Sequence, residues 1–364
     1  MDKIINEKNG EFTVKGYGAS GKLVGGKTLK EMDVTRNLPN TEEVMIEVLY
    51  CGVCHSDIHQ VNNDWDNTRY PCVPGHEVIG RIVKTGDNVK KFKVGQVVGV
   101  GCMIDSCQTC QPCENDQEQF CQGPHGPTMT YNGYFRDSAS DFNTYGGYST
   151  HITCNEKFLI KIPKDMDISA AAPILCAGIT TYSPLKQYGV TKGTNVGIVG
   201  IGGLGHMAVQ LAKALGAKVT AITTSPEKKN DAKKLGADDV LISSDADAMN
   251  KMAMRFDFIL VTIPYAFDVN PYIELLSING KLVTVGLLGD YEKPINNMNV
   301  AMWGRSIAGS VIGGIAETQE VIDFCAKNNI LPEVKLISIE DINDAFKDVK
   351  NENIRFRHVI DMSK

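Results

Sequence analysis

Residues 195–205 read Asn-Val-Gly-Ile-Val-Gly-Ile-Gly-Gly-Leu-Gly, an apolar run followed by a glycine-rich hexapeptide. The run is typical of a buried strand, and the hexapeptide, G-x-G-x-x-G, begins a helical stretch. Glycines at such a turn let the backbone and the unpaired N–H groups of the helix approach a pyrophosphate. The motif alone is weak, since a tight strand-to-helix turn can have the same pattern. Its context predicts a dinucleotide site made by Gly200, Ile201, Gly202, Gly203, Leu204 and Gly205.

The sequence around this motif alternates buried-type strands with helical stretches, which is typical of a doubly wound parallel α/β sheet. The glycines Gly216 and Gly236 stand where helix C-terminal caps belong. The predicted strands are 195–199, 218–222, 256–261 and 281–285, and the predicted helices between them include 204–215 and 227–235.

The end of the second strand bears on which dinucleotide is bound. An NAD site is expected to have a carboxylate about 20 residues after the glycines, where it holds the ribose 2′-hydroxyl. Here the strand ends in hydroxyls and lysines, which suit a 2′-phosphate because they donate hydrogen bonds and neutralise charge. NADP(H) is therefore preferred over NAD(H), with contacts from Thr223, Thr224, Ser225 and Lys228. Glu227 leaves NAD possible, and Ser225 could instead cap the next helix.

The first 165 residues have a different pattern of polar and apolar residues. Residues 42–50 alternate polar and apolar as a half-buried strand does, and 94–100 form a valine-rich segment among many Gly, Pro and Asn residues. We expect a loop-rich, mainly β domain with little regular helix. A helix over 317–327, another after Asp341 and a strand at 358–361 follow the α/β region; pattern alone does not assign them to either domain.

The size and composition of the chain indicate how many domains it has and which classes of protein it does not belong to. A chain of 364 residues with 43% hydrophobic and 22% charged residues fits two packed domains. The net charge of −6 and the scattered Lys and Arg residues argue against nucleic acid as a partner. The charged start and the lack of a run of about 20 apolar residues predict a cytoplasmic protein, neither secreted nor in the membrane.

Four of the eleven cysteines stand in C-x₂-C-x₂-C-x₇-C spacing, at Cys107, Cys110, Cys113 and Cys121. Four thiolates complete a tetrahedral zinc shell and leave no position for water, so the spacing predicts a structural zinc. An iron–sulfur cluster is the alternative for four cysteines.

A second group of candidate ligands is dispersed along the chain: Cys54, His76, Glu77 and Cys176. Taken singly, each can be interpreted as an ordinary structural residue without a role in metal binding. A buried cysteine is most often a small hydrophobe, and a lone histidine is more often a surface or core residue than a ligand.

The motifs that contain these residues, taken in order, resemble the zinc-containing medium-chain alcohol dehydrogenases, most closely their cinnamyl alcohol dehydrogenase branch. The resemblance covers nearly the whole chain. It is carried by Cys-Gly-Val-Cys-His-Ser-Asp at 51–57, Pro-Gly-His-Glu at 74–77, the four-cysteine segment, Ala-Ala-Pro-Ile-Leu-Cys-Ala-Gly at 171–178, and the glycine-rich hexapeptide.

The resemblance implies that Cys54, His76 and Cys176 hold a catalytic zinc, the Cys₂His set of alcohol dehydrogenases, with the fourth position open. Glu77 would take that position in the resting enzyme, or serve only as a carboxylate behind the ligands, and Asp57 would orient His76. The resemblance further implies a proton path through Ser56, the cofactor ribose and His59. From the residues alone, Ser56 and His59 would be ordinary loop residues.

For the fold, the resemblance implies a discontinuous GroES-like catalytic domain over 1–172 and 311–364, with a zinc lobe at about 102–122. A Rossmann domain would cover 173–310. Further cofactor contacts would come from Val285, Gly286, Ser310, Val311 and Ile312, and two copies would pair through the edge of the Rossmann sheet as a homodimer.

The expected activity is hydride transfer between NADP(H) and a primary alcohol or aldehyde, aromatic or medium-chain aliphatic, with two zinc ions per chain. In plant members a tryptophan often lines the pocket near Met129, but Trp65 and Trp303 lie elsewhere in this sequence, so dedicated lignin chemistry is not expected. One alternative is reduction of an iminium or activated C=C bond. Another is a zinc-stabilised NADP(H) sensor without turnover, which would not need Ser56, His59 and an open zinc.

Overall fold

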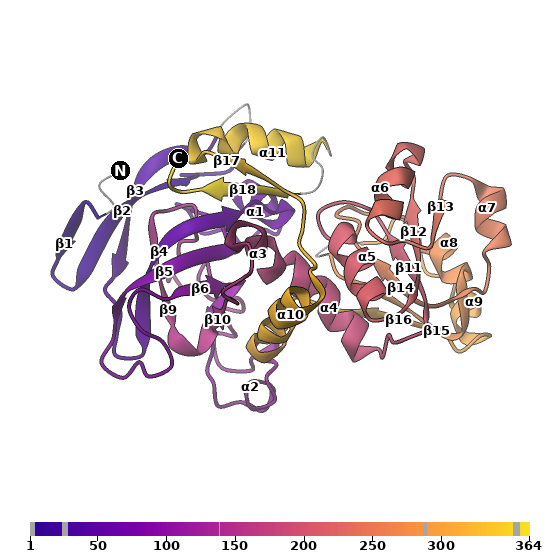
Figure 1. Ribbon diagram of the computed structural model, residues 1–364, viewed down its shortest axis with the longest axis horizontal. Coiled ribbons are helices and arrows are strands. Elements are labelled where there is room, and N and C mark those ends of the chain that lie inside the picture. Colours follow the sequence, from indigo (N-terminus) through magenta and orange to yellow (C-terminus); the bar gives the residue numbers. More distant parts are fainter. Residues whose placement is uncertain (1–3, 24–27, 138, 287–289, 352–356) are drawn as a thin grey trace. The chain divides into compact units, whose positions relative to one another are not determined.

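The computed structural model describes residues 4–23, 28–137, 139–286, 290–351 and 357–364. Its contacts divide the chain into two compact units (Figure 1). Unit 1 comprises 1–176, 313–326 and 331–364, and unit 2 comprises 177–312 and 327–330. The chain thus crosses after Cys176 and Ile312, a few residues later than the boundaries expected from the sequence, and a short piece of the C-terminal region belongs with unit 2.

Unit 2 is built on a six-stranded parallel sheet in the order β13-β12-β11-β14-β15-β16. The order runs outward in both directions from β11 and β14, as in a doubly wound sheet. The strands are β11 (Asn195–Val199), β12 (Lys218–Thr223), β13 (Asp239–Ile242), β14 (Phe256–Val261), β15 (Leu276–Thr284) and β16 (Ser306–Gly309). The predicted doubly wound fold is confirmed.

The helices of unit 2 alternate with its strands in sequence, as expected for a parallel sheet (Figure 1). They are α4 (Ala177–Gln187), α5 (Gly205–Ala214), α6 (Lys229–Lys234), α7 (Ala246–Lys251), α8 (Asn270–Glu274) and α9 (Asn297–Ala301), with the 3₁₀ turn η4 (Pro226–Lys228). Gly216, with φ of 89°, ends α5 in a left-handed conformation and donates its N–H to the Lys213 carbonyl.

Unit 1 has a larger sheet in the order β10-β6-β5-β4-β18-β17, with β9 also paired to β4. Smaller sheets join β1-β2-β3 and β7-β8. The strands are β1 (Asn6–Lys8), β2 (Glu11–Gly18), β3 (Lys30–Asn37), β4 (Glu43–Gly52), β5 (Val78–Thr85), β6 (Val97–Val100), β7 (Met103–Asp105), β8 (Thr128–Met129), β9 (His151–Asn155), β10 (Leu159–Lys161), β17 (Val334–Ile337) and β18 (Arg357–Asp361).

Strand β4 is more buried than its alternating sequence suggests. None of its ten residues is exposed, because β4 pairs with β5, β9 and β18. The antiparallel pairing of β18 with Tyr50, Cys51 and Gly52 also answers a question left open by the sequence pattern. It places the strand around residues 357–361 in the sheet of unit 1.

The helical segments of unit 1 are short except for α10, whose C-terminal end at Lys327 and Asn328 belongs with unit 2. They are α1 (His55–Asn62), α2 (Gln111–Glu114), α3 (Ile168–Ala171), α10 (Ile315–Asn328) and α11 (Ile342–Lys350), with the 3₁₀ turns η1 (Glu118–Phe120), η2 (Glu156–Phe158), η3 (Ala172–Leu175) and η5 (Ile339–Asp341).

Helix α1 corrects one interpretation of the sequence. Ser56 and His59, which local pattern alone would place in a loop, lie on this helix. Its start is stabilised by Asp57, whose Oδ2 accepts the Cys54 N–H at 2.9 Å. Because α1 is short and polar, its sequence lacks the apolar periodicity that marks longer helices.

No single helix in the described ranges is long and apolar enough to cross a membrane. One bent pair, Ile168–Leu175 with Ala177–Gln187, passes by length and composition only, and its residues are mostly buried in the protein.

Candidate metal and dinucleotide sites

The dispersed ligands come together in unit 1. Cys54 precedes α1, His76 and Glu77 lie just before β5, and Cys176 follows η3. One potential ligand atom from each of these residues lies within 4.8 Å of the others, and all four residues are buried. His76 Nε2 lies 3.2 Å from Cys176 Sγ. Two thiols and one imidazole nitrogen around a common point fit zinc.

The imidazole of His76 is held by Asp57, which is fully buried. Asp57 Oδ1 accepts from His76 Nδ1 at 3.0 Å and from the Gly75 N–H at 3.0 Å. With Nδ1–H donating to a carboxylate, the lone pair of Nε2 is available for a metal. The expected orienting role of Asp57 therefore has a geometric basis.

Glu77 makes a buried ion pair with Arg357 of β18, whose guanidinium donates to Oε1. Its Oε2 has no hydrogen-bond partner among the residues that the structure describes. A Cβ added at Gly52 would lie 1.9 Å from that oxygen, so β4 leaves space for the carboxylate only because residue 52 is glycine. Burial raises the pKa of Glu77 to about 7, while Arg357 opposes that rise.

Sequence reasoning missed Arg357 and also a third thiol beside Cys176. Cys102 hydrogen-bonds to Cys176, a contact that lowers the pKa of Cys102. Neither residue has a local signal: Arg357 lies in a strand far along the chain, and Cys102 is outside the C-x₂-C spacing.

The residues of the expected proton path lie on one turn of α1. Cys54 Sγ is 3.7 Å from Ser56 Oγ. His59 Nδ1 is 2.9 Å from Asp64 Oδ2, a partner that sequence reasoning missed because Asp64 lies beyond the end of the helix. The His59 ring is 5.5 Å from the ring of Trp65. Trp65, although remote in sequence from Met129, is therefore next to an expected catalytic side chain.

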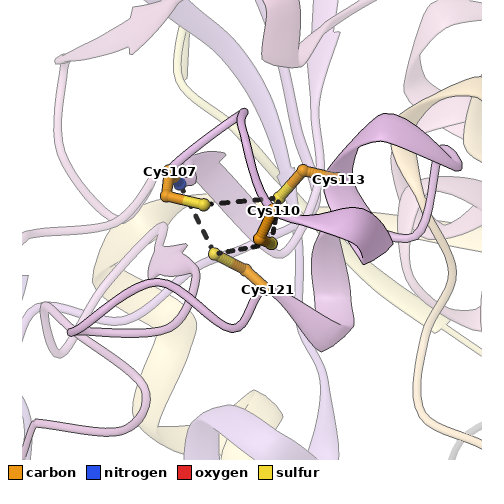
Figure 2. Close-up of side chains that lie close together, drawn as sticks. All are labelled: Cys107, Cys110, Cys113 and Cys121. Atoms are coloured by element: carbon orange, nitrogen blue, oxygen red, sulfur yellow. Dashed lines mark hydrogen bonds between the residues drawn. The ribbon is translucent and has the colours of Figure 1, made fainter.

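Cys107, Cys110, Cys113 and Cys121 form the second cluster, in the loop that contains α2 (Figure 2). The Sγ atoms of Cys110 and Cys113 are 3.4 Å apart, and those of Cys107 and Cys113 are 4.0 Å apart. Zinc–sulfur bonds of about 2.3 Å in a tetrahedron require sulfurs about 3.8 Å apart. This arrangement therefore fits a single zinc ion better than an iron–sulfur cluster.

Backbone N–H groups support the thiolates of this cluster. Those of Gln122 and Gly123 donate to Cys110 Sγ at 3.2 Å and to Cys121 Sγ at 3.4 Å. A backbone hydrogen bond from Thr109 is the main cause that lowers the pKa of Cys107 to about 6. Within the described ranges, which include every cysteine, none is disulfide-bonded.

The glycine-rich loop joins β11 to α5 in unit 2. Gly200 has φ of 89°, and a Cβ at Gly205 would lie 1.9 Å from the Gly200 carbonyl oxygen, so neither position accepts a side chain. Gly202 is exposed, with no atom within 4 Å of an added Cβ. The loop thus combines tight packing beneath with open space above, as a pyrophosphate site requires.

The other expected cofactor residues follow the carboxyl ends of neighbouring strands. Thr223 ends β12, Val285 and Gly286 follow β15, and Ser310, Val311 and Ile312 follow β16. Because these strands are parallel to β11, all of them lie at the sheet edge that carries the glycine loop.

The segment after β12 includes one buried and several accessible side chains. Thr223 is buried and its Oγ1 accepts the Ser225 N–H at 3.2 Å, whereas Thr224 is exposed and Lys228 half-buried. Ser225 occupies the N-cap position of η4, but its side chain makes no capping bond in the part of the chain that the structure describes. The capping interpretation of Ser225 is thus not supported.

Comparison with known proteins matches both units to one family. Residues 40–164 match the alcohol dehydrogenase GroES-like domain, and residues 203–327 match the zinc-binding dehydrogenase domain. The chain belongs to the zinc-containing alcohol dehydrogenase family. The prediction of this family, of its two-domain fold and of a zinc-dependent enzyme is confirmed.

Several relatives are similar to this chain over nearly their full length. Cinnamyl alcohol dehydrogenase 2 of Rauvolfia serpentina is 45% identical over 97% of this chain and 96% of its own. An aldehyde reductase of Escherichia coli (strain K12) is 45% identical over 94% of this chain and 97% of its own. A Helicobacter pylori structure described as a CAD complexed with NADP(H) has a TM-score of 0.88 and 41% identity, covering 97% of this chain and 99% of that one.

Proposed function

We propose that the chain is a zinc- and NADP(H)-dependent alcohol dehydrogenase that reduces aromatic and medium-chain aliphatic aldehydes to primary alcohols and catalyses the reverse oxidation. The observation that carries the proposal is the convergence of Cys54, His76 and Cys176 on one point, with the Ser56 hydroxyl 3.7 Å from Cys54 Sγ and His59 on the same helix. Three protein ligands leave a position on the metal for the substrate oxygen.

Bound zinc supplies a Lewis acid that polarises an aldehyde carbonyl or stabilises an alkoxide. The residues of the chain prepare its surroundings. Asp57 fixes the ring of His76, and Ser56 and His59 move the proton that accompanies hydride transfer. Asp64 accepts from His59 Nδ1 and so leaves Nε2 to exchange that proton.

Glu77 has two candidate roles in this proposal. Oε1 accepts from Arg357 and Oε2 has no partner among the described residues, so Glu77 would be able to bind the metal through Oε2 in the resting enzyme. Remaining behind the ligands as a charged neighbour is the simpler role.

The preference for NADP(H) is supported by the accessible hydroxyls and the lysine after β12, namely Thr224, Ser225 and Lys228. The Helicobacter pylori relative that was solved with NADP(H) supports the same cofactor. We assign pyrophosphate binding to Gly200–Gly205, and further contacts to Val285, Gly286 and Ser310–Ile312.

A homodimer through the edge of the unit 2 sheet is also proposed. Strand β16 is an edge strand, and large apolar side chains near it are exposed: Ile278, Met298, Met302 and Trp303. An edge strand flanked by such side chains suits pairing with a second copy. We place the enzyme in the cytoplasm, where its eleven free cysteines would stay reduced.

Steady-state reduction of cinnamaldehyde and benzaldehyde, with NADPH and NADH compared on protein assayed for zinc, tests the proposal. We expect two zinc ions per chain and turnover that favours NADPH. Two zinc ions without carbonyl turnover would contradict the aldehyde reductase and favour the sensor. If an iminium or activated C=C substrate were then reduced, that chemistry would replace the present proposal. A clear NADH preference would contradict the role given to the segment after β12.

A further inference from the structure

Asp57 is bound by a donor that belongs to none of the ligand segments. Its Oδ1 accepts from His76 Nδ1 and the Gly75 N–H, and its Oδ2 accepts from the Cys54 N–H. These three donors come from the segments that contribute Cys54 and His76. The fourth donor is the Tyr148 hydroxyl, 3.1 Å from Oδ2. A carboxylate has about four lone-pair sites, so these donors saturate it.

Tyr148 is itself held with little freedom. The side chain is fully buried, and its backbone runs beside the segment that leads to His76. The N–H groups of Gly146, Gly147 and Tyr148 donate to the carbonyls of Val73, Gly75 and Pro74 at 2.7, 2.8 and 3.0 Å. The Tyr148 carbonyl in turn accepts the N–H of Tyr17 at 2.8 Å.

A buried arginine fixes the turn from which Tyr148 projects. Nη2 of Arg36 donates to the carbonyls of Tyr145 and Gly146 at 2.9 and 3.2 Å, and to Ser149 Oγ at 2.8 Å. The position of the Tyr148 hydroxyl is therefore determined by strand β3, by residues 145–149 and by the backbone of residues 73–75 that leads to His76.

We propose that Tyr148 is a positioning residue for the catalytic metal site, whose hydroxyl holds Asp57 so that Asp57 fixes the imidazole plane of His76. The inference rests on the proposed ligand set. Without the hydroxyl, Oδ2 keeps only the Cys54 N–H, and the carboxylate can turn about its terminal torsion and carry the His76 ring with it. Misoriented imidazole weakens the metal–nitrogen bond and speeds metal loss.

The variant Tyr148→Phe removes only the hydroxyl and keeps the buried ring. Zinc release to an excess of a chromogenic chelator is measured on the full-length protein loaded with two zinc ions. We expect one of the two ions to leave about tenfold faster. This is the lower end of the loss in metal affinity seen when a group that hydrogen-bonds to a metal ligand is mutated. The ion in the four-cysteine site serves as an internal reference and should leave at the wild-type rate.

Tyr131→Phe is the matched control, because its ring lies 5.6 Å from that of His76 but its hydroxyl is not among the four described partners of Asp57. We expect this variant to release both ions at wild-type rates. Faster release from the four-cysteine site in Tyr148→Phe would indicate general loosening and would overturn the inference, as would unchanged release from both sites.

A double-mutant cycle with Asp57→Asn tests whether Tyr148 acts through Asp57. If it does, adding Tyr148→Phe to Asp57→Asn changes the rate of zinc release by less than about twofold, because the Asp57 carboxylate through which Tyr148 acts is already absent. Full additivity of the two effects would overturn the inference. A wild-type chain that binds one zinc ion would contradict the proposed catalytic site and this inference together. Two zinc ions with unchanged release in Tyr148→Phe would contradict the inference alone.

Discussion

The two metal clusters of unit 1 are built in different ways. The four cysteines at 107–121 come from one loop, and backbone N–H groups of the same loop support their sulfurs. Cys54, His76 and Cys176 come from separate segments. They depend on Asp57, which follows Cys54 closely, and on Tyr148 and Arg357, which lie elsewhere in the chain. A closed site can be made by a loop that the metal itself folds. A site with an open position needs surrounding structure to hold its ligands apart, because the metal cannot do so.

The largest expected effect is the loss of catalytic activity when a ligand of the dispersed cluster is substituted. Cys176→Ser should lower kcat/KM for aldehyde by about ten-thousandfold, equivalent to about 5.5 kcal/mol of transition-state stabilisation, because the Lewis acid is lost or misplaced. The protein should stay folded, since the ligand segments are held by other contacts. Kinetics, zinc analysis and thermal melting check this. A melting temperature that collapses along with activity would contradict the distinction between the clusters.

The converse substitution lies in the four-cysteine loop. Cys113→Ser should unfold residues 102–122 locally and lower the free energy of unfolding by about 4 kcal/mol, because the metal organises a loop with little core of its own. Zinc content and limited proteolysis measure this. Rapid cleavage inside the loop is expected, and a loop that stays resistant without its zinc would show that the protein fold alone maintains it.

The proton path gives a smaller effect. His59→Gln should reduce kcat about hundredfold, the size of a typical general acid–base contribution, and leave zinc content at two. Asp64→Asn should reduce kcat less, because His59 keeps its position on α1 and loses only the carboxylate that accepts from Nδ1. Steady-state kinetics with zinc analysis measures both effects. An unchanged kcat in His59→Gln would exclude His59 from the path.

The smallest effect concerns the segment that leads to Cys176. The Asp167 carboxylate caps α3 by accepting from the Ser169 hydroxyl and N–H at 2.7 and 2.9 Å. Asp167→Ala should lower the free energy of unfolding by about 1 kcal/mol, the usual cost of a lost N-cap. Chemical denaturation measures it.

The pH dependence of this cap has a defined sign. The hydrogen bond from Ser169 lowers the pKa of Asp167 below its ordinary 3.8. A depressed carboxyl pKa means that the stabilisation is present above pH 3.8 and disappears as the pH falls through the lowered pKa. The difference between wild type and Asp167→Ala should therefore shrink only below about pH 4. A difference that disappears nearer neutral pH would contradict the capping role.

The contrast between the clusters also explains what the sequence could predict. The four-cysteine site and the glycine loop are visible because spacing within one segment determines them, and the parallel sheet is visible because each buried strand is a continuous apolar run. The dispersed set was interpretable only through resemblance to a family. Arg357, Tyr148 and Cys102 have no sequence signal, because strand pairing and turns far from the ligands bring them to the site. Helix α1 was not predicted because it is short and mostly polar, with Ile58 and Val61 as its apolar residues.

Strand β18 has a consequence for how the enzyme is made. Ribosomes synthesise the chain from its N-terminus, so Cys54, His76 and Cys176 emerge long before Arg357 and its strand. Until then the Val53 N–H lacks the His358 carbonyl that accepts it at 3.0 Å, and Glu77 is without its counter-ion. A nascent chain halted after residue 330 would contain every residue of unit 2, yet its unit 1 would have an open edge at β4 and an unfinished metal centre. Completion of the proposed catalytic site would therefore require translation of the C-terminal segment.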